Sequence, residues 1–102
     1  MGIALALIFT LPLFAKNIEL KEVSNADRLT ICQYILEENY QEEAEIAEYM
    51  LNYCVERSQL SYQSYPSFKE RTINAHIWFS PYYIHRCEIE MSFDQVGIAN
   101  CQ

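Results

Sequence analysis

Two histidines and four cysteines carry most of the reactive chemistry available to this chain. His85 and Cys87 are two positions apart, so on a strand their side chains would lie on the same face. Such a pair could act as a Cys–His nucleophile or as half of a metal site. A histidine on a strand face beside a disulfide cysteine explains the same spacing, and we expect this structural role.

Motifs for hydrolysis or nucleotide binding are missing from the sequence. There is no G-x-S-x-G, no H-E-x-x-H and no phosphate-binding glycine loop, since the only glycines are Gly2 and Gly97. We therefore expect no enzyme activity and no cofactor. A secreted effector or small enzyme that uses His85 with a carboxylate is the remaining catalytic hypothesis.

The cysteines are even in number, as in the disulfide framework of an exported protein. They allow three pairings, and we expect two local bridges. Each bridge closes a loop whose constraint contributes about 3 kcal/mol in the chain-entropy model. Zinc binding is the alternative, but no C-x-x-C occurs, so we expect no metal site. The expected bridges are Cys32–Cys54 and Cys87–Cys101.

The densest charge lies in residues 29–56, which contain seven acidic residues and no Lys, Arg, Gly or Pro. The chain has a formal net charge of −7 and would repel phosphate, so we expect no nucleic-acid partner. A solvated helix face that maintains solubility would explain the acidic residues. The functional alternative is docking of a basic protein, steered by long-range attraction. The EExxE spacing could also hold a hard cation, but no EF-hand loop is present.

Tyrosines in the acidic stretch favour the docking hypothesis. Tyrosine provides a large contact area at low entropic cost and is enriched at interfaces, although some of these rings would simply pack at the edge of the core. The residues that we expect to bind the partner are Glu38, Glu42, Glu45, Glu48, Tyr34, Tyr40 and Tyr49.

The same stretch predicts two helices that form a hairpin turning near residues 39–41. Ser24 can cap the first helix, with Asp27 three positions later as an acidic form of the capping box. Asn39 followed by Glu42 offers a second cap. Apolar residues recur at helical spacing in both halves. They are Ile31, Cys32, Ile35 and Leu36, then Ala44, Ala47, Met50, Leu51, Cys54 and Val55.

The cysteines discriminate between this hairpin and one unbroken helix over residues 26–57. In a hairpin folded about position 43, Cys32 and Cys54 are mirror images and close enough to pair. In a single helix they would lie about 33 Å apart, at about 1.5 Å per residue. We expect the hairpin, because the single helix would leave its apolar stripe uncovered.

Period-two patterns over residues 73–79 and 87–93 predict an antiparallel pair of strands. A three-residue loop at residues 80–82 puts the apolar side chains on one face, whereas a two-residue turn pairs His76 with His85 and splits that set. Residues 58–67 are polar and read as a connecting loop, and the tail would return so that Cys101 reaches Cys87. The expected pairs are Ile73 with Ile89, Ala75 with Cys87, and Phe79 with Tyr83.

The expected fold class is therefore α+β, a disulfide-stabilised helical hairpin packed on a small antiparallel β-hairpin or sheet. An all-α arrangement is the alternative. Residues 1–15 are almost wholly apolar but too short to span a bilayer, which needs about 20 residues. They suit a signal peptide, although no Lys or Arg precedes the apolar run; a buried core helix and an uncleaved anchor are the alternatives. Cleavage leaves residues 16–102 as one small domain that is periplasmic or secreted, without stable membrane insertion.

Export, disulfides, a missing catalytic set and an acidic, tyrosine-bearing helical face together predict a binding protein. We expect a periplasmic inhibitor or immunity protein that occludes a basic enzyme or toxin. The alternative is an envelope accessory or assembly protein without inhibitory activity. A homodimer is compatible with either hypothesis.

Overall fold

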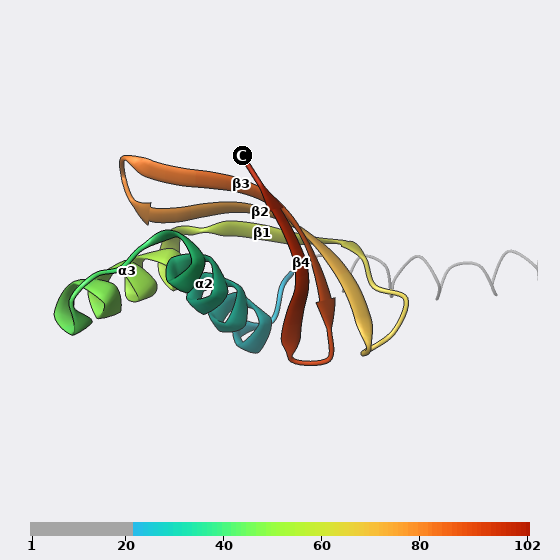
Figure 1. Cartoon of the computed structure of the whole chain (residues 1–102). Coiled ribbons are helices and arrows are strands. Elements are labelled where there is room, and N and C mark those ends of the chain that lie inside the picture. Colours follow the sequence, from blue (N-terminus) through green and yellow to red (C-terminus); the bar gives the residue numbers. More distant parts are fainter. Residues whose placement is uncertain (1–21) are drawn as a thin grey trace, which may run out of the picture.

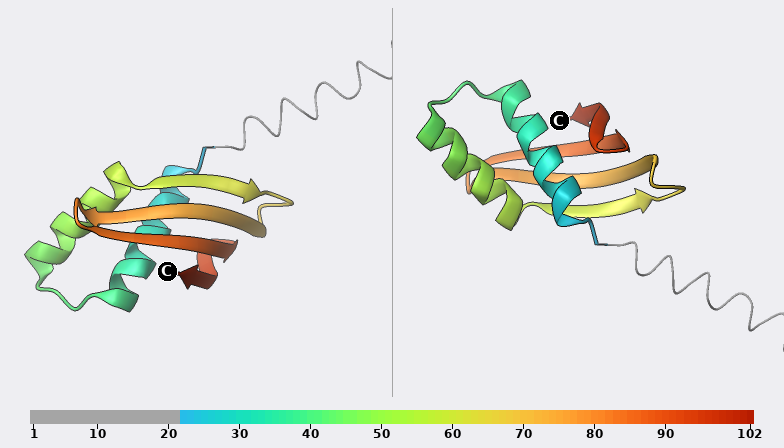
Figure 2. Two further views of the ribbon diagram at one scale, coloured as in Figure 1. Left: turned by 90° about the horizontal axis from the view of Figure 1, so that it is seen from above. Right: turned by 90° about the horizontal axis from the view of Figure 1, so that it is seen from below.

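Two helices cover one face of a four-stranded antiparallel sheet in the computed structural model, which describes residues 22–102 (Figure 1). Each strand pairs with its neighbour in sequence, in the order β1-β2-β3-β4. This arrangement confirms the α+β prediction, and Figure 2 shows that neither α2 nor α3 lies on the other face of the sheet. The elements are α2 (Asn25–Asn39), α3 (Ala44–Arg57), β1 (Gln59–Ser64), β2 (Glu70–Ser80), β3 (Tyr83–Ser92) and β4 (Gln95–Cys101).

The expected signal peptide, its alternatives and the domain start at residue 16 lie outside the described residues. Within residues 22–102, neither helix has the length and apolar character needed to cross a membrane.

The helical hairpin forms as expected, and its first disulfide joins the two helices. Helix α2 begins after Ser24, whose Oγ accepts a 3.1 Å hydrogen bond from the Asp27 amide. The Cys32–Cys54 bridge has a Cα–Cα separation of 5.9 Å. An unbroken helix over this stretch is therefore wrong. The chain turns between the two helices, over residues 40–43.

The second predicted cap is wrong. Asn39 is the last residue of α2, and its side-chain amide donates to the Ile35 carbonyl oxygen at 2.8 Å. Helix α3 instead begins after Glu43, which makes no side-chain capping bond. Asn39 stays helical because the turn lies farther along the chain than the sequence pattern suggests.

The prediction of a loop over residues 58–67 is also wrong, because β1 occupies Gln59–Ser64. Leu60 and Tyr62 are half-buried against the core, while the other residues of the strand are exposed. The strand pairs with β2 along one edge, and Glu22 bridges to Ser61 on the other. Tertiary pairing makes this polar segment a strand although its own apolar pattern is weak.

The register of β2 and β3 is the predicted one over most of its length. Ile73 lies opposite Ile89 and Ala75 opposite Cys87, so the apolar side chains face the helices together. The expected three-residue loop and the pairing of Phe79 with Tyr83 are wrong.

The strands are joined instead by a two-residue turn at positions 81–82, and Ser80 pairs with Tyr83. Phe79 is the extra residue of a β-bulge, which offsets the shorter turn and preserves the register beyond it. The Phe79 side chain remains fully buried. The Trp78 amide, beyond the end of the β1 ladder, donates to Ser58 Oγ at 2.9 Å.

Strand β4 returns along β3, and Cys101 lies directly opposite Cys87, to which it is bonded. Both expected bridges are thus present, and no cysteine is free among the described residues. The helices and the covered face of the sheet enclose one core. Its most deeply buried side chains are Ile31, Cys32, Ile35, Cys54, Ile73, Ile77, Phe79 and Ile89.

A buried ion pair fixes the end of the molecule where α2 and β2 begin. Arg71 Nε and Nη2 donate to the two carboxylate oxygens of Asp27 at 2.8 and 3.0 Å. The same guanidinium donates to the carbonyl oxygens of Phe68 and Phe93, in the β1–β2 and β3–β4 connections. Phe93 has a φ of 56°, in the left-handed region of the backbone, which residues other than glycine adopt only at a cost in conformational energy. Arg71 therefore holds one helix and two turns in place.

The capping box at the start of α2 is completed through a third side chain. Tyr62 Oη accepts from the Ser24 amide at 3.2 Å and donates to Asp27 Oδ2 at 2.8 Å. Asp27 therefore supports the cap indirectly, since its carboxylate is directed at Arg71 and Tyr62. Every polar atom of this buried cluster has a partner, which a buried charge pair requires.

Replacing Arg71 should strongly destabilise the fold. Arg71→Leu leaves the buried Asp27 carboxylate without its counter-charge, so we expect the free energy of unfolding to fall by about 3–5 kcal/mol. Urea denaturation of the oxidised protein at pH 7 measures this change. Arg86→Leu, at an exposed position on the helix-free face, is the matched control and should change stability by no more than about 0.5 kcal/mol. Equal effects of the two variants would contradict the role assigned to Arg71.

Candidate functional site

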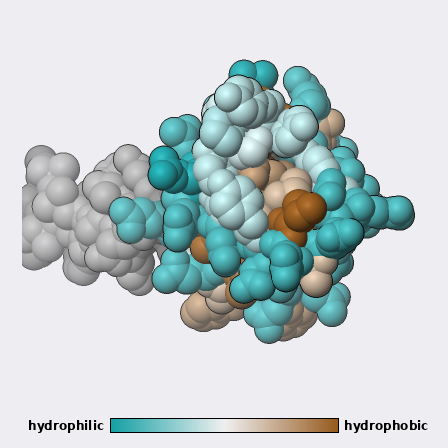
Figure 3. Space-filling view, turned by 90° about the vertical axis from the view of Figure 1, so that its left-hand side faces the viewer, coloured by the Kyte–Doolittle hydropathy of each residue, from teal (hydrophilic) through white to brown (hydrophobic). Residues whose placement is uncertain are grey.

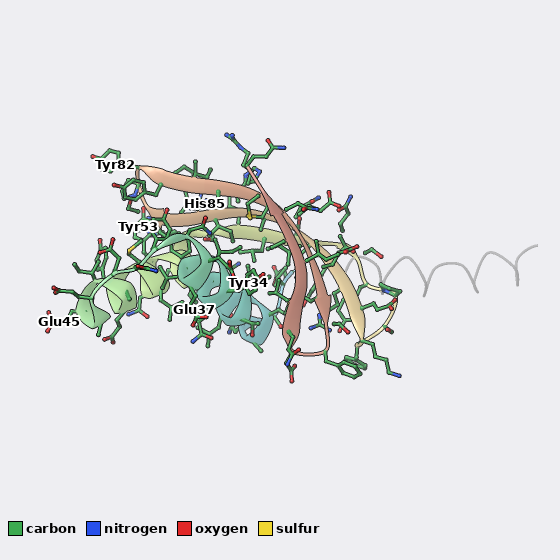
Figure 4. The ribbon with its side chains drawn as sticks, viewed as in Figure 1. Tyr34, Glu37, Glu45, Tyr53, Tyr82 and His85 are labelled. Carbon is green, nitrogen blue, oxygen red and sulfur yellow. A yellow bond between two sulfur atoms is a disulfide. The ribbon has the colours of Figure 1, made fainter. Side chains whose placement is uncertain are left out.

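A cluster of glutamates lies where α2 connects to α3, at the end of the molecule away from Arg71. They lie on the last turn of α2, on the connection and on the first turns of α3, and all are exposed. Figure 4 shows Glu37 and Glu45 pointing away from the sheet. Among the described residues the one ion pair is the buried Asp27–Arg71, so these carboxylates have no cationic partner. The cluster comprises Glu37, Glu38, Glu42, Glu43, Glu45 and Glu48.

The charged residues at the ends of α3 interact favourably with its helix dipole, whereas those at the end of α2 do not. Helix α3 has Glu45 in its first turn and Arg57 in its last, both favourable positions. Arg28 adds a second cation at that end, where Nη1 donates to the carbonyl oxygens of Val55 and Ser58 at 3.0 and 2.6 Å. Helix α2 has no basic residue in its last turn, where Glu37 and Glu38 face the negative end of its dipole. Helix stability therefore does not explain these two carboxylates.

A groove of about 350 Å³ runs between the helices at this end. Its apolar lining comes from Leu36, Ala47 and Leu51, and Tyr40 lies at the turn. Polar and acidic residues complete the lining. They are Gln33, Glu37, Gln41, Glu42 and Glu48.

The structure divides the residues predicted to bind a partner. Tyr40, Glu42 and Glu48 line the groove together. Tyr34 packs against the core, and Glu38 follows it by four positions on the same stripe of α2, outside the groove lining. The groove includes Glu37, which the sequence placed in the acidic cluster but not among the binding residues. Only the helix-to-helix packing distinguishes Glu37 from Glu38.

The remaining predicted residues, Glu45 and Tyr49, lie on the solvent side of α3. Tyr49 is 64% exposed, and its ring centroid lies 6.4 Å from that of Tyr53. The Arg57 guanidinium lies over the Tyr53 ring. Tyr82 and Tyr83 are exposed at the β2–β3 turn of the same end. Figure 3 views this end and shows side chains of intermediate hydropathy gathered beside strongly hydrophilic ones. The Tyr83 ring lies 6.2 Å from the Tyr40 ring, and Tyr49 follows Glu48 on α3, so these two exposed tyrosines border the acidic cluster.

Tyr40 links the helical turn to the sheet. Its hydroxyl is 2.8 Å from Nε2 of His85, and its ring meets Phe79 edge-on at 5.3 Å between centroids. Figure 4 shows His85 between β3 and the helices. Burial raises the pKa of Tyr40, with a smaller contribution from Tyr83, so the hydroxyl keeps its proton. Either neutral tautomer of His85 completes this hydrogen bond, since a phenolic hydroxyl can donate or accept, and the bond holds the Tyr40 ring beside the groove.

The Cys–His pair considered from the sequence does not form a nucleophilic site. Cys87 is bonded to Cys101, and His85 is directed to Tyr40. No group of three or more potential metal ligands occurs among residues 22–102. His85 and Cys87 therefore have structural partners.

No family model, curated protein or solved structure matches this chain. Its function must therefore be inferred from its own residues.

The stability of the protein should depend on pH through His85. Burial lowers the pKa of His85 below its ordinary value of 6.5, so near that pH the unfolded chain binds more protons than the folded protein. The stabilisation is complete above the unfolded pKa and is lost as the pH falls towards the folded pKa. Unfolding free energies measured from pH 8 to pH 5 should therefore decrease, and less steeply in His85→Gln. His76→Gln, on the helix-free face, is the control and should retain the wild-type slope.

Proposed function

We propose that this chain is an exported acidic binding protein that occludes a basic enzyme or toxin, as an inhibitor or immunity protein. The observation that carries the proposal is the exposed acidic cluster, which has no cation beside it among the described residues. Two of its members, Glu37 and Glu38, oppose the dipole of their own helix. A basic partner would neutralise these charges.

The surroundings of the cluster suit a protein partner. Tyr49 on α3 and Tyr83 beside Tyr40 offer exposed aromatic area next to the carboxylates. Aromatic residues anchor interfaces, while surrounding charges steer the encounter and fix the register. A nucleic acid would be repelled by the same surface.

The two disulfides suit an oxidising compartment, such as the periplasm or the extracellular space. The periplasmic or secreted location proposed here joins that chemistry to the apolar start of the sequence. The proposed partner would be a basic protein of the same compartment, for example a wall-degrading enzyme or a delivered toxin.

Charge reversal on the acidic face should abolish partner capture. The variant Glu38→Lys, Glu42→Lys, Glu45→Lys presents like charge to a basic partner, so we expect at least a hundredfold weaker binding at low salt. The measurement is affinity capture of basic proteins from envelope extract and from competitors' secretions, at low and high salt, followed by titration of the captured protein.

The matched control is Glu70→Lys, Glu88→Lys, Glu90→Lys, which makes the same change in net charge at exposed positions of the sheet. It should retain most of the affinity. Equal losses of affinity in both variants would mean that binding depends only on net charge, and would contradict a specific acidic face. Recovery of only the chain itself, or of membrane assembly components, would favour the envelope accessory protein instead.

A single neutralisation should affect stability and binding in opposite directions. Glu38→Gln removes an unfavourable charge at the end of α2, so we expect the free energy of unfolding to rise by about 0.3–1 kcal/mol at low salt. The same change should weaken capture of the basic partner. Glu45→Gln, in the first turn of α3, should lower stability by a similar amount. Stability changes of the same sign in the two variants, measured by urea denaturation, would contradict the dipole argument.

A further inference from the structure

The groove between α2 and α3 combines an apolar floor with an acidic rim. Leu36 is buried, and Ala47 and Leu51 are half-buried against the core, so the floor is firm and aliphatic. Glu37, Glu42 and Glu48 are exposed above it, and no Lys or Arg of residues 22–102 lines the groove. A purely apolar ligand would leave the carboxylates without a partner, and a small cation would leave the apolar floor exposed to water.

A long cationic side chain satisfies both parts of the groove. The methylene stem of an arginine can lie on apolar surface while its charged end reaches a polar rim. Its planar guanidinium has five donors, which suits several carboxylates around one groove, and it stacks on aromatic rings. The Tyr40 ring is held at the turn by the hydrogen bond to His85. The groove volume of about 350 Å³ is large enough for one such side chain.

We propose that this groove binds a single arginine side chain of the partner, with the stem on Leu36, Ala47 and Leu51 and the guanidinium among Glu37, Glu42 and Glu48. The inference rests on the proposed function, because it names the partner group that the acidic face would recognise. Arginine is enriched among the residues that dominate interface energies. The groove thus supplies the anchor, and the outer carboxylates and tyrosines surround it.

The test is an NMR titration of the ¹⁵N-labelled, oxidised protein with N-acetyl-arginine amide. We expect saturable shifts confined to the groove, including the amides of Gln33, Ala47 and Leu51, with a dissociation constant in the millimolar range. N-acetyl-citrulline amide has nearly the same shape without the charge and should bind at least fivefold more weakly. Equal shifts with both probes, or unsaturable shifts spread over Glu56, Glu88 and Glu90, would overturn the proposal.

Two variants separate the floor from the rim. Ala47→Phe fills the floor without changing charge and should remove saturable arginine binding. The pair Glu37→Gln, Glu48→Gln should weaken it at least fivefold, whereas the matched pair Glu88→Gln, Glu90→Gln, exposed on β3 and outside the groove lining, should leave it unchanged. If Ala47→Phe does not fold, the Gln pair decides the question, and wild-type arginine affinity in that pair would overturn the proposal.

The groove and the proposed function can fail separately. Capture of a basic partner that is lost on charge reversal, together with an arginine titration that never saturates, would overturn the groove assignment alone. Saturable arginine binding that responds to both groove variants would support the groove even before a partner is known.

Discussion

The buried pair of Asp27 and Arg71 is the interaction on which the rest of the structure depends. A domain of this size buries only about 60% of its unfolded surface, so its hydrophobic core alone gives it only marginal stability. Arg71 adds order at the end where α2 and β2 begin, because it binds the start of α2 and the carbonyl oxygens of both neighbouring connections. Burial of two charges is tolerated because Tyr62 and the backbone complete their hydrogen bonding.

The disulfides act on each layer separately. Cys32–Cys54 joins the two helices, and Cys87–Cys101 joins β3 to the edge strand β4. Neither bridge connects the helices to the sheet, so the contact between layers depends on the shared core, on Asp27–Arg71 and on the hydrogen bonds that Tyr62 and Tyr40 make across it. Ser58 strengthens the junction between α3 and β1, since its Oγ donates to Cys54 Sγ and accepts from the Trp78 amide.

Local sequence patterns predicted both layers of this fold. The features that these patterns missed depend on contacts between residues far apart in the sequence. The Ser24 cap, the hairpin and the register of Ile73 with Ile89 follow from spacing alone. Strand β1 was missed because its polar edge residues form a strand only through pairing with β2. The bulge at Phe79 and the ion pair between Asp27 and Arg71 could not be predicted from local patterns, because both depend on pairing with distant residues. In the candidate site, composition located the acidic cluster, but only the packing of α2 on α3 places Glu37 in the groove.

The acidic helix turn and the Asp27–Arg71 cluster lie at opposite ends of the molecule (Figure 1). Substitutions in the exposed residues of the turn leave the ion pair, both disulfides and the sheet untouched. Sites that share no contacts contribute nearly additively to stability. The surface proposed to bind a partner, between residues 37 and 49, could therefore change in sequence without loss of the fold.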